Sequence, residues 1–203
     1  MSLDSARHVR DLTDPKTIRA LAHPTRLRLL ELLAVEGPLT ATRAGEHLGE
    51  SPASCSFHLR SLKKYGFVTE AEGSRGRERP WRIANIGNRW TDAADSPAEL
   101  TFAGRQLSRV VSDYDLGRFR DWQATQDAYP AKWRAVAGGN NALIFVTAEE
   151  LQQIVERLIA VIEPYMNRIE NKESRPPDAL PVMALLYAFP TAPPTDDGER
   201  DDA

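Results

Sequence analysis

Apolar residues recur at intervals of three and four positions through the first third of the chain, as expected for amphipathic helices. Proline and capping residues divide this pattern into separate helices. The first helix should begin after Thr13 or Asp14 as N-cap, with Pro15 at its first position, and run to about Ala22. Pro24 disfavours helical geometry at the residue before it, so the pattern predicts a second helix and a sharp joint.

Three further boundaries follow from the same signals. Gly37 and the proline after it end the second helix. Thr40 is placed to cap a short third helix that ends at Gly49, and Ser51 is placed to cap a fourth. Gly66 stands where a left-handed C-terminal cap belongs. The sequence therefore predicts four helices, the last two of which form a helix-turn-helix.

The fourth helix has an unusual division of faces. Cys55, Leu59 and Leu62 fall at i, i+4 and i+7 and form one narrow apolar stripe. No acidic residue occurs between Glu50 and Glu70, although surface helices usually mix acids with bases. The other side carries small polar, aromatic and cationic residues: Ala53, Phe57, Arg60, Ser61 and Lys64. This face is suited to a negatively charged partner.

After Gly66 the period of the pattern changes from helix to strand. Residues 67–71 and 79–84 read as two short strands, and the GSRG sequence at 73–76 reads as the turn between them. The sequence thus predicts a hairpin with a basic tip. Three arginines lie two positions apart, so that they project from one face of an extended segment: Arg75, Arg77 and Arg79.

A second part of the chain begins with a candidate capping box at 96–99 and continues as a long helix that Gly117 is expected to interrupt. Short strands are expected at 142–146 and 181–189, where they can pair with each other. Between them, a capping box formed by Thr147 and Glu150 opens an amphipathic helix over 148–170.

These elements predict a mainly α fold with a small β-hairpin, divided into three parts. Residues 1–90 form a winged helix-turn-helix domain, and residues 91–189 form a second, α+β domain for dimerisation and possible effector sensing. Residues 190–203 are Pro-rich and acidic, which is typical of a disordered tail.

Charge and composition narrow the possible partners and compartments. The net charge of −3 averages over unlike halves: residues 1–83 carry +4 and residues 84–203 carry −7. Attraction to phosphate depends on where cations cluster, so the basic first half is compatible with nucleic acid. A single cysteine, no signal-peptide pattern and no long apolar run favour a cytoplasmic protein without a membrane segment.

The helix-turn-helix and the basic hairpin together suggest binding to double-stranded DNA. The major groove admits one α-helix whose outward side chains are small and polar enough to read base edges. The preceding helix braces against the backbone, and the hairpin arginines suit the minor groove or flanking phosphates. The candidate DNA-binding residues are Thr40, Arg43, Ser51, Ser54, Ser56, Phe57, His58, Arg60, Lys64, Arg75, Arg77 and Arg79.

Plainer interpretations accompany two of these predictions. His58 lies close to the buried flank of its helix, so packing is as good an interpretation as DNA contact. The hairpin arginines also fit a solubilising loop, which is the commoner role of a charge run.

Residues 14–84 resemble the winged helix-turn-helix of ArsR/SmtB-type bacterial transcription regulators. The resemblance is carried by LAHPTRLRLLELL, by GPLTATRAGEHLGESPASCSFHLRSLKKYGFV and by GRERPWRI, in that order. It implies a homodimer that binds a near-palindromic operator, most often as a repressor. Metal-sensing members carry a cysteine pair before the recognition helix, whereas Cys55 is alone here, so no thiolate metal site and no cofactor are expected.

The alternative function is that of a small-molecule-binding protein or enzyme whose winged helix serves only as a protein-docking module. The sequence has no Gly-rich phosphate loop, no G-x-S-x-G and no H-E-x-x-H. We therefore expect a regulator that is not an enzyme, with a possible small-molecule effector bound by the second domain.

Overall fold

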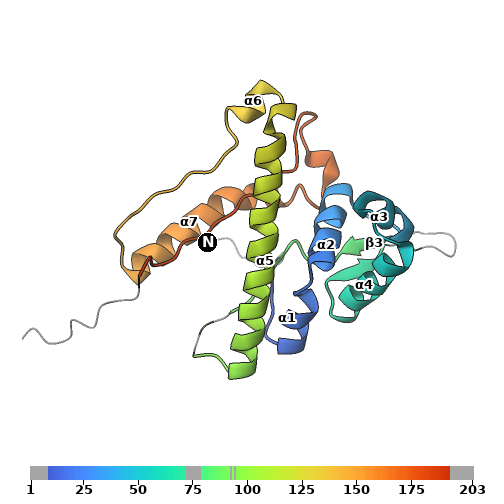
Figure 1. The fold of residues 1–203 in the computed structure, drawn as a ribbon, viewed down its shortest axis with the longest axis horizontal. Coiled ribbons are helices and arrows are strands. Elements are labelled where there is room, and N and C mark those ends of the chain that lie inside the picture. Colours follow the sequence, from blue (N-terminus) through green and yellow to red (C-terminus); the bar gives the residue numbers. More distant parts are fainter. Residues whose placement is uncertain (1–8, 72–78, 92, 94, 193–203) are drawn as a thin grey trace, which may run out of the picture.

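The computed structural model describes residues 9–71, 79–91, 93 and 95–192, and its elements run from a short strand to a short 3₁₀ helix (Figure 1). The elements are β1 (Val9–Asp11), α1 (Pro15–Leu21), α2 (Pro24–Glu36), α3 (Ala41–Leu48), α4 (Pro52–Lys64), β2 (Val68–Glu70), β3 (Trp81–Ile83), β4 (Gly87–Arg89), α5 (Ala98–Thr125), η2 (Gln126–Ala128), α6 (Ala131–Arg134), α7 (Ala148–Met166) and η3 (Lys172–Ser174). The fold is mainly helical with small strands. We call residues 9–91 the winged region and residues 131–192 the C-terminal region.

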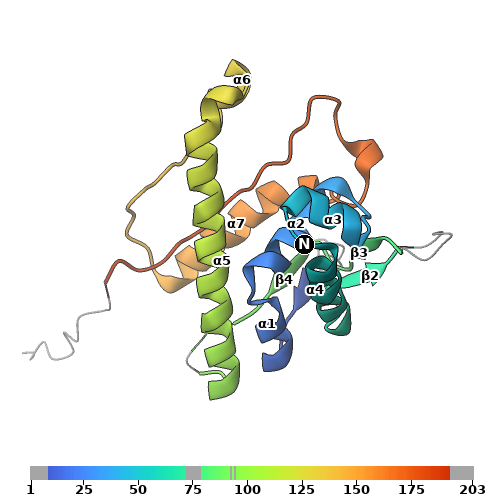
Figure 2. The same cartoon turned by 45° about the vertical axis from the view of Figure 1, so that its right-hand side comes forward.

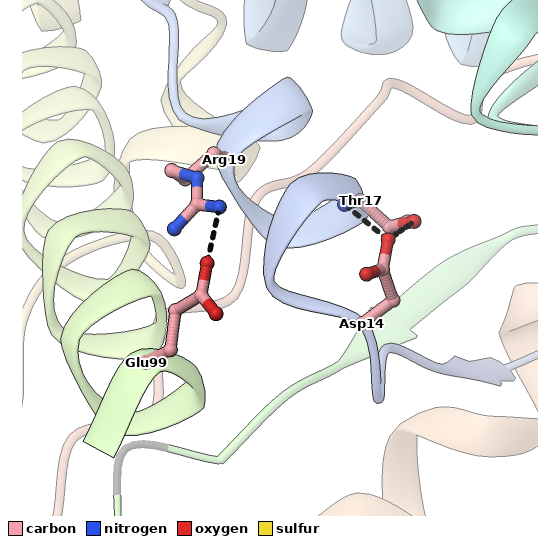
Figure 3. A network of polar contacts seen from close by, with 4 residues as sticks. All are labelled: Asp14, Thr17, Arg19 and Glu99. Carbon is pink, nitrogen blue, oxygen red and sulfur yellow. Dashed lines mark hydrogen bonds and ion pairs between the residues drawn. The ribbon is translucent and has the colours of Figure 1, made fainter. Parts of the chain in front are cut away.

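The predicted helix boundaries in the winged region are confirmed by their caps. The carboxylate of Asp14 accepts hydrogen bonds from the backbone N–H and the hydroxyl of Thr17, at 2.8 and 2.6 Å (Figure 3). Thr40 and Ser51 cap α3 and α4 in the same way. Gly49 ends α3 in the left-handed conformation, with φ of 67°. Each helix therefore begins and ends where its local sequence satisfies the free backbone groups.

One continuous core holds the winged region together and includes the first half of α5. Its fully buried side chains come from α1, α2, α3, α4, the segment after α4, and α5. α1 packs along α5, and Arg19 on α1 forms a 2.8 Å ion pair with Glu99 near the start of α5 (Figure 3). The largest of the buried side chains are Ile18, Leu29, Leu33, Leu59, Leu62, Phe67 and Leu107.

Two small sheets complete the winged region. The predicted hairpin is present as antiparallel β2 and β3, with Val68 opposite Ile83 and Glu70 opposite Trp81. The second sheet was not expected: β1 and β4 pair in parallel, although they lie far apart in sequence. The backbone of Trp81 also exchanges hydrogen bonds with Leu39, which ties the hairpin to the segment before α3.

The second part of the chain departs from its predicted α+β character. Neither 142–146 nor 181–189 is a strand, and both predictions are wrong for this structure: each segment runs irregularly and exposed, with no neighbouring strand to supply ladder hydrogen bonds. α5 continues through Gly117 without interruption, because a helix tolerates one glycine at about 1 kcal/mol.

Of the two capping boxes predicted in this part of the chain, one is absent and the other is present. The capping box expected at 96–99 is absent, because Pro97 is the N-cap of α5 and no side chain caps it. The box formed by Thr147 and Glu150 is confirmed at α7, although α7 ends at Met166 rather than at 170. Figures 1 and 2 show α7 lying apart from α1, α3 and α4, and it packs extensively against no helix or strand that the structure describes.

Candidate nucleic-acid interface

The position of α4 is fixed by its apolar stripe and by a close turn from α3. Cys55, Leu59 and Leu62 are fully buried, as the stripe predicts. At the turn, a Cβ on Gly45 would lie 2.6 Å from the carbonyl oxygen of Glu50, so only glycine permits α3 and α4 to approach this closely. Figure 2 shows α4 at the edge of the winged region, beside α3.

The opposite face of α4 is exposed and carries no acid. Ala53, Phe57, Arg60 and Lys64 all point to solvent, and Phe57 is 59% exposed although it is a large aromatic residue. Ser54 and Ser56 are half-buried on the flanks of this face. An exposed phenyl ring among small and cationic side chains is unusual for a solvated helix and suits contact with a partner.

Two of the candidate DNA-binding residues are N-caps: Thr40 caps α3 and Ser51 caps α4. The hydroxyl oxygen of Thr40 accepts the N–H of Arg43 at 3.2 Å, and that of Ser51 accepts the N–H of Ser54 at 3.1 Å. Capping uses each oxygen as an acceptor, so the hydroxyl hydrogen remains a donor for a phosphate oxygen. A cap and a phosphate contact are therefore compatible at both positions.

The structure places His58 on the buried flank of α4, which favours the packing interpretation over the predicted DNA contact. Its side chain is only 9% exposed, and its ring lies 4.6 Å from that of His23 and edge-on to Phe57. Burial, helped by His23 and Arg26, lowers the pKa of His58 below its usual range. The residue sits on the buried flank because α4 turns that flank towards the joint between α1 and α2, where His23 is the N-cap of α2.

Three cations around α4 form exposed ion pairs: Arg43, Lys63 and Arg79. Arg43 pairs with Glu46 at 2.5 Å, and Arg79 pairs with Glu70 at 2.6 Å. Lys63 also contacts Glu70, and these two cations lower the pKa of the Glu70 carboxyl. Exposed pairs of this kind contribute only about 0.2–1 kcal/mol, so phosphate groups can compete for the same cations.

Two exposed cations near the α4 face were not among the predicted DNA-binding residues: Arg82 on the hairpin and Lys63 on α4. Arg75 and Arg77 lie outside the described residues. Arg82 is exposed on β3 because strand residues alternate sides, with Trp81 and Ile83 turned inwards. Lys63 was also overlooked, and its ammonium lies 5.6 Å from the ring centre of Trp81. Strand alternation was the signal that would have identified Arg82.

The described residues were also compared with the requirements of a metal site. No group of three or more His, Cys, Asp or Glu is placed to hold a metal ion within them. Burial raises the pKa of the Cys55 thiol, which disfavours the thiolate that a metal requires. A hollow of about 160 Å³ lies between α2 and the segment after β3, lined by Leu30, Glu31, Ala34, Phe67, Ile83, Asn85, Ile86 and Asn88.

Comparison with known families decides the nature of this motif. Residues 21–71 match a family model described as a helix-turn-helix domain. Residues 21–71 are a helix-turn-helix domain. The match spans α2, α3, α4 and β2 and so includes the outward face of α4, whereas Arg79 and Arg82 lie beyond its end. Among the helices that the structure describes, none has the length and hydropathy needed to cross a bilayer.

Two solved structures resemble parts of the chain that holds this helix-turn-helix domain. One is the solution structure of the homodimeric winged helix-turn-helix DNA-binding domain of Mb0332 from Mycobacterium bovis, a possible ArsR-family transcriptional regulator. It is 24% identical, covers 55% of this chain and 81% of that chain, and has a TM-score of 0.32. The other, a mutant of ZitR from Lactococcus lactis, is 17% identical, covers 70% and 75%, and has a TM-score of 0.30.

Likeness at these TM-scores does not establish a shared overall fold, so the assignment rests on residues 21–71. No curated protein matches the sequence closely enough to count as a relative.

Proposed function

We propose that this protein is a sequence-specific, double-stranded DNA-binding transcription regulator of ArsR-like type, acting in the cytoplasm as a homodimeric repressor. The observation that carries this proposal is the outward face of α4. It is exposed, free of acids, and held by the helix-turn-helix domain in the position of a recognition helix.

The face of α4 offers the two kinds of contact that a specific DNA-binding protein needs. Arg60 and Lys64 can neutralise phosphates and fix the register of the helix in the groove. Ser56 and Phe57 can read base edges, the phenyl ring by contact with a thymine methyl. On the hairpin, Arg79 can exchange its ion pair with Glu70 for a phosphate.

A dimer follows from the length of the site that one α4 can read. A single recognition helix spans only a few base pairs, and two of them placed about 34 Å apart read a near-palindromic operator. The resemblance to ArsR-type regulators supports the same arrangement. It also supports repression as the direction of control. The proposal further includes a small-molecule effector bound by residues 91–189, and the single Cys55 argues against a thiolate-bound metal.

The proposal is tested by selecting bound duplexes from a random DNA library and then measuring affinity against salt concentration. Arg60→Ala and Lys64→Ala should weaken binding to all sequences, and each lost phosphate contact should reduce the salt slope by about 0.9. Arg157→Ala, a cation exposed on α7, serves as the matched control and should leave both unchanged.

Base reading is tested separately. Ser56→Ala or Phe57→Ala should relax discrimination at one base pair by about 1–3 kcal/mol while leaving the salt slope intact. If the wild-type protein shows no duplex binding even at low salt, the proposal fails, and the winged helix is better explained as a protein-docking module.

A further inference from the structure

The C-terminal region exposes an unusual amount of apolar surface. The most exposed large apolar side chains in the described residues gather between 136 and 189: Phe145 at 96%, Val136 at 78%, Leu143 at 75%, Phe189 at 73% and Val182 at 71%. Large apolar side chains exposed to this degree and in this number are rare on a monomeric soluble protein and indicate an interface.

α7 contributes a second part of this surface. The helix begins with a complete capping box and runs for 19 residues, yet none of them is buried. Leu151, Ile154 and Leu158 repeat at helical spacing along one side, and Ile162 and Tyr165 continue it. An amphipathic helix is stabilised mainly by packing of its apolar side, and among the described residues α7 finds no element that covers this side.

The two segments beside α7 have the sequence of strands without their hydrogen bonds. Residues 142–146 read ALIFV and residues 181–189 read PVMALLYAF, with no charge in either. No backbone hydrogen bond joins 142–146 or 181–189 to a residue that the structure describes. Extended, uncharged, β-branched and aromatic segments with open backbone groups are templates for pairing with another strand.

Charge indicates what kind of partner covers this surface. The polar side of α7 carries four glutamates and one arginine, which repel both DNA and an anionic lipid surface. The neutral strand-like segments suit pairing with a protein edge. An obligate homodimer buries about 2,000–5,000 Å² or more of largely apolar surface, and an uncharged apolar surface suits such an interface.

We propose that a second copy of this chain covers the C-terminal region, with residues 142–146 and 181–189 becoming paired strands across the interface while α7 packs against its counterpart. This inference rests on the homodimer of the proposed function and gives that dimer its interface. It places the contact in the C-terminal region, away from the exposed face of α4.

The interface is tested with the full-length chain by light scattering during gel filtration, at several concentrations. Wild type should be a dimer. Phe145→Asp combined with Val182→Asp should raise the dimer dissociation constant at least about 100-fold, because each carboxylate would be buried without a partner. Both positions are exposed in the single chain, so these changes spare its fold. Gln153→Asp, on the polar side of α7, is the matched control and should leave the dimer intact.

Strand pairing is tested by amide hydrogen exchange. The amides of 142–146 and 181–189 should exchange slowly in the wild-type dimer and fast in the double variant. Ile144→Pro, which removes one amide and cannot sit within a ladder, should weaken the dimer as well. Fast exchange in a wild-type dimer would overturn the paired strands.

Other outcomes separate this inference from the proposed function. A wild-type monomer at every concentration, or a double variant that stays dimeric, overturns the interface and leaves DNA binding to be judged by its own assay. Co-sedimentation of wild type with phosphatidylcholine–phosphatidylglycerol vesicles also overturns it, since lipid would then be the occupant. A dimer that dissociates as expected but binds no duplex supports the interface and refutes the regulator.

Discussion

α4 and α7 are both short amphipathic helices opened by a side-chain cap, yet the chain treats them in opposite ways. α4 has a narrow apolar stripe, and that stripe is completely buried. α7 has a broader apolar side, and none of its residues is buried. The difference shows that the apolar pattern of a helix predicts a need for a partner, whereas burial depends on whether the same chain supplies that partner.

The largest expected difference between α4 and α7 is in the free energy of unfolding that a truncated side chain costs, measured on a dilute, monomeric sample. Leu59→Ala in α4 removes a fully buried side chain from the core and should cost about 2–5 kcal/mol. Ile159→Ala in α7 truncates a half-exposed side chain and should cost less than about 1 kcal/mol. Urea denaturation measures both, and equal losses would contradict the contrast.

A smaller effect is expected where the C-terminal region attaches to the winged region. The guanidinium of Arg175 donates to the carbonyl oxygens of Ala34 and Val35 at the end of α2 and to those of Arg168 and Ile169. Arg175→Ala should cost about 1.5–3 kcal/mol, because charged hydrogen bonds to these carbonyls are lost.

Arg175→Lys provides the control for this attachment. The lysine keeps the charge but lacks the planar fork, so it should recover only part of the loss. Hydrogen exchange around residues 34–37 should quicken in the alanine variant. Unchanged exchange there would show that the attachment contributes nothing to the end of α2.

The smallest effect is the pH dependence that His58 gives to the winged region. Because burial lowers its pKa in the folded chain, the unfolded chain binds the proton more readily. Stability should be full above the ordinary histidine pKa of about 6.5 and fall as the pH drops below it towards the lowered value. His58→Gln should flatten the melting temperature between pH 7 and pH 5. A wild-type curve that is flat over this range would contradict the argument.

The helices of the winged region could be predicted because their signals are local. Asp14, Thr40 and Ser51 cap their own helices, and Gly49 ends one within the same short stretch. The buried stripe of α4 needed only helical periodicity. β1 and β4 could not be found in this way, since each has three residues, including Arg10 and Asn88, and each is defined by a partner more than seventy positions away.

The candidate site was predictable to the extent that it follows from helical geometry. The outward direction of Phe57, Arg60 and Lys64 agrees with the period of α4. The sequence did not decide whether His58 is buried. Its burial depends on tertiary packing, which brings His23, at the joint between α1 and α2, beside it. The missing strands of the C-terminal region reflect the same limit: β propensity indicates a surface to be paired and does not identify the partner.

The parallel pairing of β1 with β4 has a mechanical consequence. The chain enters the winged region through β1 and leaves it through β4, and the two strands are held in register by hydrogen bonds. A pull between the N-terminal end of β1 and the C-terminal end of β4 is therefore resisted by shear across the hydrogen bonds of this pair. Only three residues separate β3 from β4. A movement of β4 is therefore transmitted directly to the hairpin beside α4.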